Sequence, residues 1–315
     1  MMSSQEDIFT LDIPPSIVLL FIIILILGYF IFRSEINPVI LYGWNKIGSM
    51  FQKFHFPFKR RTGNKKTTVK RKHFHFDVKA LESQMIFIEG GCFQMGDLFN
   101  EGASNEYPLH EVWLSDYYLS DRLVTQEQWI GVMGNNLSRF SYHKTLPVEN
   151  VSYDDALEFI SRINAACDEK YRLPTEAEWE FAARERGRDV RFGNGKNIAD
   201  PSEINFNADI SFLRKYSRPG KFFKGPSPVG SFPANALGLF DMSGNLFEWL
   251  LDYYQDSAYL HHTILDPVCT HKNSFRVARG GSWNNHASRI RCSCRSYFNP
   301  SVRNSLVGFR LAKSK

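Results

Sequence analysis

The longest uniformly hydrophobic stretch of the chain lies near its N-terminus, at residues 16–32. It contains no charged side chain, and as a helix it would rise about 25 Å, at the short end of what spans a bilayer core. The preceding residues carry Glu6, Asp7 and Asp12 but no Lys or Arg, and no small-residue cleavage site follows. These features favour an uncleaved anchor over a signal peptide. We therefore predict a short tail over 1–15 and a transmembrane anchor over 16–32.

Basic residues dominate the segment that follows. Residues 33–72 hold eleven Lys and Arg against the single acid Glu35. The positive-inside rule therefore predicts a single-pass membrane protein with its C-terminal domain in the cytoplasm. We expect residues 33–80 to form a basic juxtamembrane linker that contacts anionic lipid headgroups rather than nucleic acid. The odd number of cysteines, five, agrees with a reducing compartment.

From about residue 81 the pattern becomes that of one compact domain, which we bound at 81–315. Three hydroxyl residues, each followed three positions later by a side chain that can reach back, predict helix starts. These pairs are Thr125 with Gln128, Ser152 with Asp155, and Thr175 with Glu178. In the second helix Leu157, Ile160 and Ile163 fall on one face, which we expect to be buried.

The remaining apolar segments are short and separated by residues that favour turns. Residues 85–96, 111–120 and 275–283 predict strands joined by long loops. The chain is 43% hydrophobic and 15% aromatic, enough for a sizeable core, which excludes a disordered or fibrous protein. The sequence therefore predicts an α+β domain with much irregular backbone, for which bound ions are candidate stabilisers.

Several segments together resemble one family. They are 85–96, 147–157, 171–184, 228–249 and 276–311, the last of which begins with RVARGGSW and ends in GFRL. This combination resembles the sulfatase-modifying-factor, or formylglycine-generating-enzyme, domain. The resemblance implies a C-type-lectin-like fold. It does not imply one activity, because the family includes oxidases and binding proteins.

The resemblance implies a structural calcium site in the turn at residues 241–249. Its ligands would be the carboxylates of Asp241 and Glu248 and the backbone carbonyls of Gly244 and Leu246. Hard oxygen ligands of this kind suit calcium. The alternative is a turn closed by a capping Asp241, with Glu248 buried against an arginine.

The resemblance also allows a test for oxidase chemistry. The oxidases of this family hold copper with two cysteine thiolates, three and eight positions after the serine of RGGS. Here that serine is Ser282, and the corresponding positions are Asn285 and Ile290, so copper is not expected. Ser282 and the Cys292–Cys294 pair remain the candidate catalytic residues. Oxygen-dependent oxidation of a substrate cysteine remains the alternative function.

The segment 284–308 is compositionally unusual, with no Lys, Glu, Gln, Met or Trp in 25 residues. Adenine-directed randomisation of Asn codons cannot produce these five types, and the spacing resembles the variable region of diversity-generating-retroelement proteins. In this interpretation Arg279, Gly281, Trp283, Arg295, Gly308 and Arg310 form the scaffold. The predicted ligand-binding face is Asn284, Asn285, His286, Ser288, Arg289, Cys294, Ser296, Tyr297, Phe298, Asn304 and Ser305.

Tyr and Phe give rigid contact area on such a face, while Ser and Asn supply adaptable hydrogen bonds. We therefore predict a binding module for a protein or small-molecule ligand, with no nucleic-acid partner. Joint replacement of Asn285 and Tyr297 should abolish binding with little loss of stability. The alternative is an ordinary family member whose last loops are rich in Asn and Ser.

Overall fold

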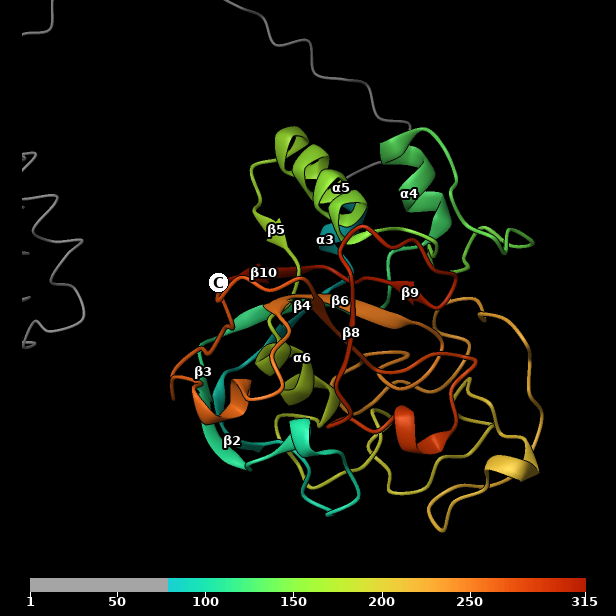
Figure 1. The fold of residues 1–315 in the computed structure, drawn as a ribbon. Helices are drawn as coiled ribbons and strands as arrows, with labels where there is room; N and C mark the ends of the chain where they lie inside the picture. Colours follow the sequence, from blue (N-terminus) through green and yellow to red (C-terminus); the bar gives the residue numbers. More distant parts are fainter. Residues whose placement is uncertain (1–78) are drawn as a thin grey trace, which may run out of the picture. The chain divides into compact units, whose positions relative to one another are not determined.

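The computed structural model describes residues 79–315, and the predicted anchor and most of the predicted linker lie outside them. None of the helices within 79–315 is both long and apolar enough to cross a membrane. The described residues form an α+β arrangement in which short sheets and four helices are joined by long irregular loops (Figure 1).

Three of the four described helices begin where the sequence predicts: α4 (Gln126–Met133), α5 (Tyr153–Ala166) and α6 (Glu176–Ala183). The short helix α3 (Lys79–Glu82) was not predicted, and it begins inside the segment expected to be linker. The three predicted helices each start with the predicted capping box, in which the hydroxyl accepts from the backbone three residues on and the later side chain binds back. Helix α5 buries Ile160 and Ile163 as predicted, but Leu157 is 39% exposed. The buried stripe is centred on Ala156 and Phe159, so Leu157 lies outside it.

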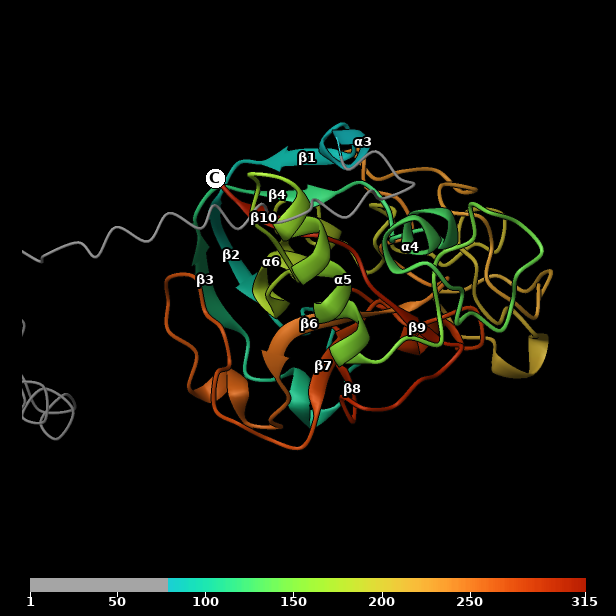
Figure 2. The same ribbon diagram turned by 90° about the horizontal axis from the view of Figure 1, so that it is seen from above.

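The strands form three sheets. The first has the order β1 (Met85–Ile88), β4 (Tyr117–Ser120), β10 (Ala312–Ser314) and β5 (Tyr171–Arg172). The second pairs β2 (Gly91–Met95) with β3 (His110–Leu114), and the third has the order β8 (Ser296–Phe298), β7 (Arg276–Arg279), β6 (Phe247–Tyr253) and β9 (Val307–Gly308). Each of the first two predicted strand segments therefore divides between two sheets. Strand β10 lies beside β4 in Figure 2 and also pairs with β5, which ties the last residues to earlier parts of the domain.

The core contains a network of buried ion pairs as well as apolar clusters. All eight residues of α6 are buried, including Glu176 and Glu180. Glu176 pairs with Arg295 at 2.7 Å, and Glu180 pairs with Arg184 and Arg279. Burial opposes the ionisation of Glu176, but Arg295 and Arg279 hold the pKa of this carboxyl below its usual range. These pairs connect α6 to the segments that carry Arg184, Arg279 and Arg295.

Candidate functional site

A tight glycine turn after β7 positions the C-terminal loop. Gly280 and Gly281 adopt φ values of 89° and 71°, which favour glycine. A Cβ atom on Gly281 would lie 2.5 Å from Cγ2 of Ile290, so no side chain fits there. The turn leads directly into Ser282 and Trp283.

Three loops that are distant in the sequence meet at Trp283. The ring of Phe140 contacts the Trp283 ring edge-on, with centroids 5.6 Å apart, and Phe222 stacks on it at 6.2 Å. Trp283 Nε1 donates to the carbonyl of Ser305 at 3.4 Å. The backbone N–H of Asn207 donates to the carbonyl of Asn285 at 2.9 Å, which joins the middle loop to the C-terminal one.

Aromatic side chains from the two earlier loops continue this surface. Phe212 of the 3-10 turn η2 (Ile210–Phe212) stacks on His286 with ring centroids 5.6 Å apart. In Figure 1 this turn is the yellow one at the right, and the orange-red turn beside it is η4 (Ala287–Arg289). Tyr142 and Phe223 are 66% and 42% exposed. We call the following exposed and half-buried side chains the Trp283 face: Tyr142, Phe212, Phe223, Asn284, His286, Arg289 and Tyr297. Tyr297 is included because it follows Ser296, whose hydroxyl bonds to Arg289.

The structure exposes part of the predicted ligand-binding set and buries the rest. Asn284, Arg289 and Tyr297 are exposed, while Asn285, His286, Ser288, Phe298, Asn304 and Ser305 are half-buried. The prediction is wrong for Cys294 and Ser296, which are 2% and 6% exposed. Alternation along β8 explains Ser296, because it points inward where Tyr297 points outward. Its hydroxyl accepts from Arg289 Nη2 at 3.0 Å, so it supports a residue of the face instead of belonging to it.

Two of the half-buried residues of the C-terminal loop make contacts with the interior of the domain. Asn285 Oδ1 accepts from both the N–H and the hydroxyl of Ser282, at 3.0 and 2.7 Å. Phe298 packs edge-on against Phe247 and Trp249. These contacts make Asn285 and Phe298 part of the framework, whereas Tyr297 stacks on Tyr254 and keeps one side toward solvent.

Sequence reasoning missed the earlier aromatic residues of this surface, Phe140, Tyr142, Phe212, Phe222 and Phe223. They lie in loops with no strand or helix periodicity, so no pattern of elements placed them beside residue 283. The signal available in the sequence is the mixture of aromatic and basic residues at 139–144 and 210–224.

The candidate catalytic residues are buried and already bonded. Ser282 is fully buried against Asn285, and Cys292 and Cys294 are 1% and 2% exposed. Burial raises the pKa of the Cys292 thiol to about 12 and also raises that of Cys294. Both thiols therefore remain protonated at neutral pH, whereas copper ligation and nucleophilic attack need the thiolate.

The predicted calcium turn is closed by an ion pair. Both carboxylate oxygens of Glu248 accept from Arg310, at 2.6 Å from Nε and 2.9 Å from Nη2. Asp241 Oδ2 accepts from the backbone N–H of Gly230, and burial raises the pKa of Asp241 to about 6. A guanidinium thus engages the carboxylate that calcium would need, and the oxygens of Asp241, Gly244, Leu246 and Glu248 do not fit calcium in this arrangement. Within residues 79–315 no three or more His, Cys, Asp or Glu side chains are grouped to hold a metal ion.

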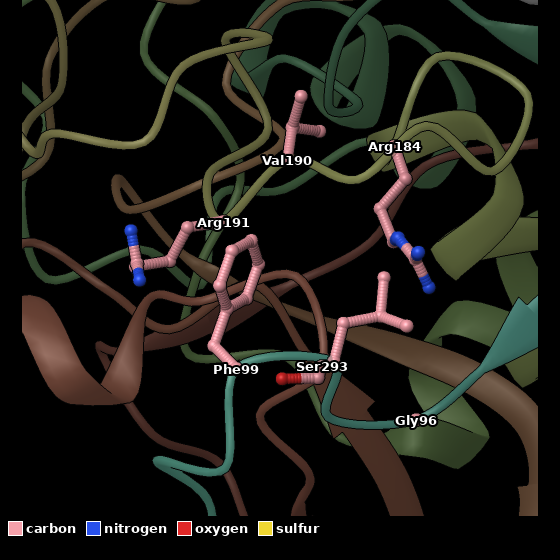
Figure 3. A pocket seen from close by; sticks show the side chains of 7 residues that line it. Gly96, Phe99, Arg184, Val190, Arg191 and Ser293 are labelled. Carbon is pink, nitrogen blue, oxygen red and sulfur yellow. The ribbon is translucent and has the colours of Figure 1, made fainter. Parts of the chain in front are cut away.

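The cavities are weaker candidates for a ligand-binding site than the Trp283 face. The pocket in Figure 3 has room for about one water molecule, roughly 10 Å³, and its Arg184 and Arg191 are bonded to Glu180 and Glu101. A larger cavity of about 340 Å³ lies between Leu114 and Lys315. Four of its charged groups are paired, Arg172 with Glu178 and Lys315 with Asp116, and the fifth, Asp266, accepts from the N–H and hydroxyl of Ser115.

The long loops, short sheets and glycine turn before Trp283 define a C-type-lectin-like domain of the formylglycine-generating-enzyme type. The chain belongs to the family described as "Sulfatase-modifying factor enzyme 1-like domain", whose match covers residues 72–315. The family and fold predicted from the sequence are therefore confirmed.

Three relatives illustrate the breadth of this family. The serine/threonine-protein kinase pkn1 of Chlamydia caviae is 32% identical over 264 residues, which are 74% of this chain but 38% of that protein. The chain thus spans less than two fifths of this relative. The formylglycine-generating enzyme of Streptomyces coelicolor is 26% identical over 280 residues, 71% of this chain and 87% of that enzyme. The structure of Treponema denticola variable protein 1 is similar with a TM-score of 0.61 and 26% identity, over 73% of this chain and 95% of that one.

Proposed function

We propose that this chain is a binding module whose protein or small-molecule ligand contacts the Trp283 face. The observation that carries the proposal is the division of the C-terminal segment into two sets of side chains. Ser282, Cys292 and Cys294 are buried, while Asn284, Arg289 and Tyr297 face solvent. A surface that exposes rigid aromatic and adaptable polar side chains suits recognition.

Photocrosslinking of the full chain tests this proposal. A benzophenone amino acid would replace Tyr297, which is 47% exposed, or in the matched control Phe87, which is 45% exposed on β1. In cells of the source organism, the label at position 297 is expected to give a discrete adduct that the label at position 87 does not. Identical adducts from both positions, or none from position 297, would refute a ligand-binding role for this face.

Diversification by a retroelement is the more specific form of the proposal. The similarity to a variable protein of Treponema denticola and the composition of residues 284–308 support it. Sequencing downstream of the gene should then find a near-copy of the 284–311 coding stretch that differs mainly at adenines, accompanied by a reverse transcriptase gene. Absence of both would leave a binding module with a fixed face.

The formylglycine-generating oxidase remains the alternative, and the Streptomyces coelicolor relative is what favours it. That activity requires accessible thiolates, and the buried Cys292 and Cys294 argue against it. Copper(I) titration and oxygen uptake with a cysteine-containing peptide test the alternative directly. Stoichiometric copper binding that is lost on replacing both cysteines would establish the oxidase over the binding module.

For the part of the chain before residue 79 we propose a single-pass anchor at 16–32, with the linker 33–80 against anionic lipid and the domain in the cytoplasm. The uncharged segment and the basic flank support this topology. Carbonate extraction should leave the chain in the membrane pellet, and protease added to right-side-out vesicles should spare the domain. Release by carbonate or digestion of the domain would contradict it.

A further inference from the structure

The loops that meet at Trp283 come from parts of the chain without acidic residues. Segments 128–148, 210–240 and 267–315 contain none of the 33 Asp and Glu residues. The middle segment alone contributes five basic residues within 15 positions: Arg214, Lys215, Arg218, Lys221 and Lys224. Parts of these segments meet near Trp283, so the exposed basic side chains there form a positive patch. The buried arginines of the last segment are paired with carboxylates and do not contribute to it.

Several cations at this patch have no ionic partner. Lys215 pairs with Glu101 and Arg218 with Asp200, so their charges are partly neutralised. Within residues 79–315 the remaining basic side chains of the patch form no ion pair: Arg139, Arg214, Lys221, Lys224 and Arg289. Two of them still act electrostatically on nearby carboxylates, Lys224 on Asp209 and Arg139 on Glu149. A surface cation without a partner contributes more binding free energy when a carboxylate arrives than a cation that must first break an existing ion pair.

His286 lies close enough to two of these cations for their charge to act on its imidazole. Burial lowers the pKa of His286, and Arg214 and Arg289 lower it further. His286 is the residue on which Phe212 stacks, so the positive charge surrounds an exposed aromatic surface. Ile210 at the start of the same turn is 73% exposed, and Lys221 lies over the ring of Phe223 at 4.6 Å.

We propose that the Trp283 face and the adjoining loop 210–224 bind an acidic polypeptide segment that also carries apolar side chains. This proposal rests on the proposed function and names the chemistry of its ligand. The unpaired cations match carboxylates, and Ile210, Phe212 and Phe223 offer apolar contact between them. Exposed aromatic and arginine side chains interleaved with Asn and His are typical of a protein-binding surface. Nucleic-acid binding depends mainly on many phosphate contacts, for which five unpaired cations are few.

The test is a fluorescence-anisotropy titration of the full chain in non-ionic detergent with a labelled glutamate–tyrosine copolymer (4:1). The basic residues of 59–72 are replaced by Gln in every variant, because that segment would also attract a polyanion. Lys221→Glu with Lys224→Glu should weaken binding at least tenfold. The matched control Lys170→Glu with Lys272→Glu has the same change in net charge at exposed positions near β5 and before β7, and should change binding less than twofold.

Three results would overturn the proposal: no binding of the copolymer, equal losses in the two double variants, or equally tight binding of a lysine–tyrosine copolymer. Tighter binding of a 20-residue oligothymidylate or of phosphatidylserine vesicles, lost in the same variant, would assign the patch to nucleic acid or lipid instead. If the double variant unfolds, Lys221→Gln with Lys224→Gln repeats the comparison. A positive crosslink from position 297 without copolymer binding would retain the binding face and reject only its acidic ligand.

Discussion

The turn at 241–249 could be closed by the ion pair between Glu248 and Arg310 or by a bound calcium ion. The variant Glu248→Gln separates these two accounts. Glu248 and Arg310 are both completely buried. Gln has the shape of Glu but no charge, so the variant leaves Arg310 buried without its counter-ion. Removing one partner of a buried pair typically costs about 3–5 kcal/mol.

Because Arg310 has other contacts that keep it buried, we expect the loss in free energy of unfolding to fall within that range. Its Nη1 donates to the carbonyl of Ser120 at 3.1 Å, and its Nη2 donates to that of Phe240 at 2.9 Å. These bonds hold the guanidinium in place when the carboxylate is neutralised, so the side chain cannot turn to solvent. For a domain of this size each kcal/mol corresponds to about 2–4 °C in Tm, so we expect Glu248→Gln to lower Tm by about 6–20 °C.

The assay is thermal unfolding of the full chain and the variant, each with 1 mM calcium and with EDTA. If the ion pair closes the turn, wild type melts at the same temperature in both buffers and the variant is equally destabilised in both. A calcium ion at 100 times its Kd would instead stabilise wild type by about 2.7 kcal/mol, and the variant would lose that response. A rise of 5 °C or more in the Tm of wild type with calcium would refute the ion-pair account.

Three further predictions concern buried polar groups and the loop. Burial raises the pKa of Asp241 to about 6, so this carboxyl binds its proton more tightly in the folded chain than in the unfolded chain. Its contribution to the free energy of unfolding is present below pH 4 and is lost as pH rises through 6. Asp241→Asn should therefore have a higher urea midpoint than wild type at pH 7 but not at pH 4, and equal midpoints at both would contradict it. Asn285→Ala should cost about 1–3 kcal/mol in urea unfolding, because the buried Ser282 hydroxyl loses its acceptor, whereas an unchanged midpoint would return Asn285 to the ligand-binding set. Cys292 and Cys294 should react with a thiol reagent only in denaturant, and rapid modification of either in the folded chain would show that the thiols are accessible.

Local chemistry explains what the sequence predicts well. The three capping boxes involve residues three positions apart, so Thr125 with Gln128 identifies a helix start without knowledge of the rest of the chain. The strand segments are predicted by composition, but the division of 85–96 into β1 and β2 depends on which sheets the two halves join. The family could be predicted because several segments of this chain match motifs of that family and follow one another in the expected order.

The candidate site depends on contacts that no short-range pattern encodes. Phe140 meets Trp283 across more than 140 residues, and both lie in loops without periodicity. Asn285 illustrates a related limit of local patterns, because an Asn in a loop rich in Asn and Ser has the same local signature whether it faces solvent or bonds to Ser282. Long-range partners decide such cases, and the sequence alone does not reveal them.

The arginines of the C-terminal segment show how one stretch can both hold the fold and carry the surface for which we propose a binding role. With no acidic residue after Asp266, every buried arginine there must find its carboxylate elsewhere in the chain. Arg291 reaches Glu106, Arg295 reaches Glu176 and Arg310 reaches Glu248. Each pair fixes the segment to a different part of the domain, because an unpaired buried charge is costly. Beside these fixed points, side chains such as Arg289 and Tyr297 are exposed and can change without breaking a pair. Variation confined to such positions would alter the ligand while leaving the fold intact, which is the property a diversified binding face requires.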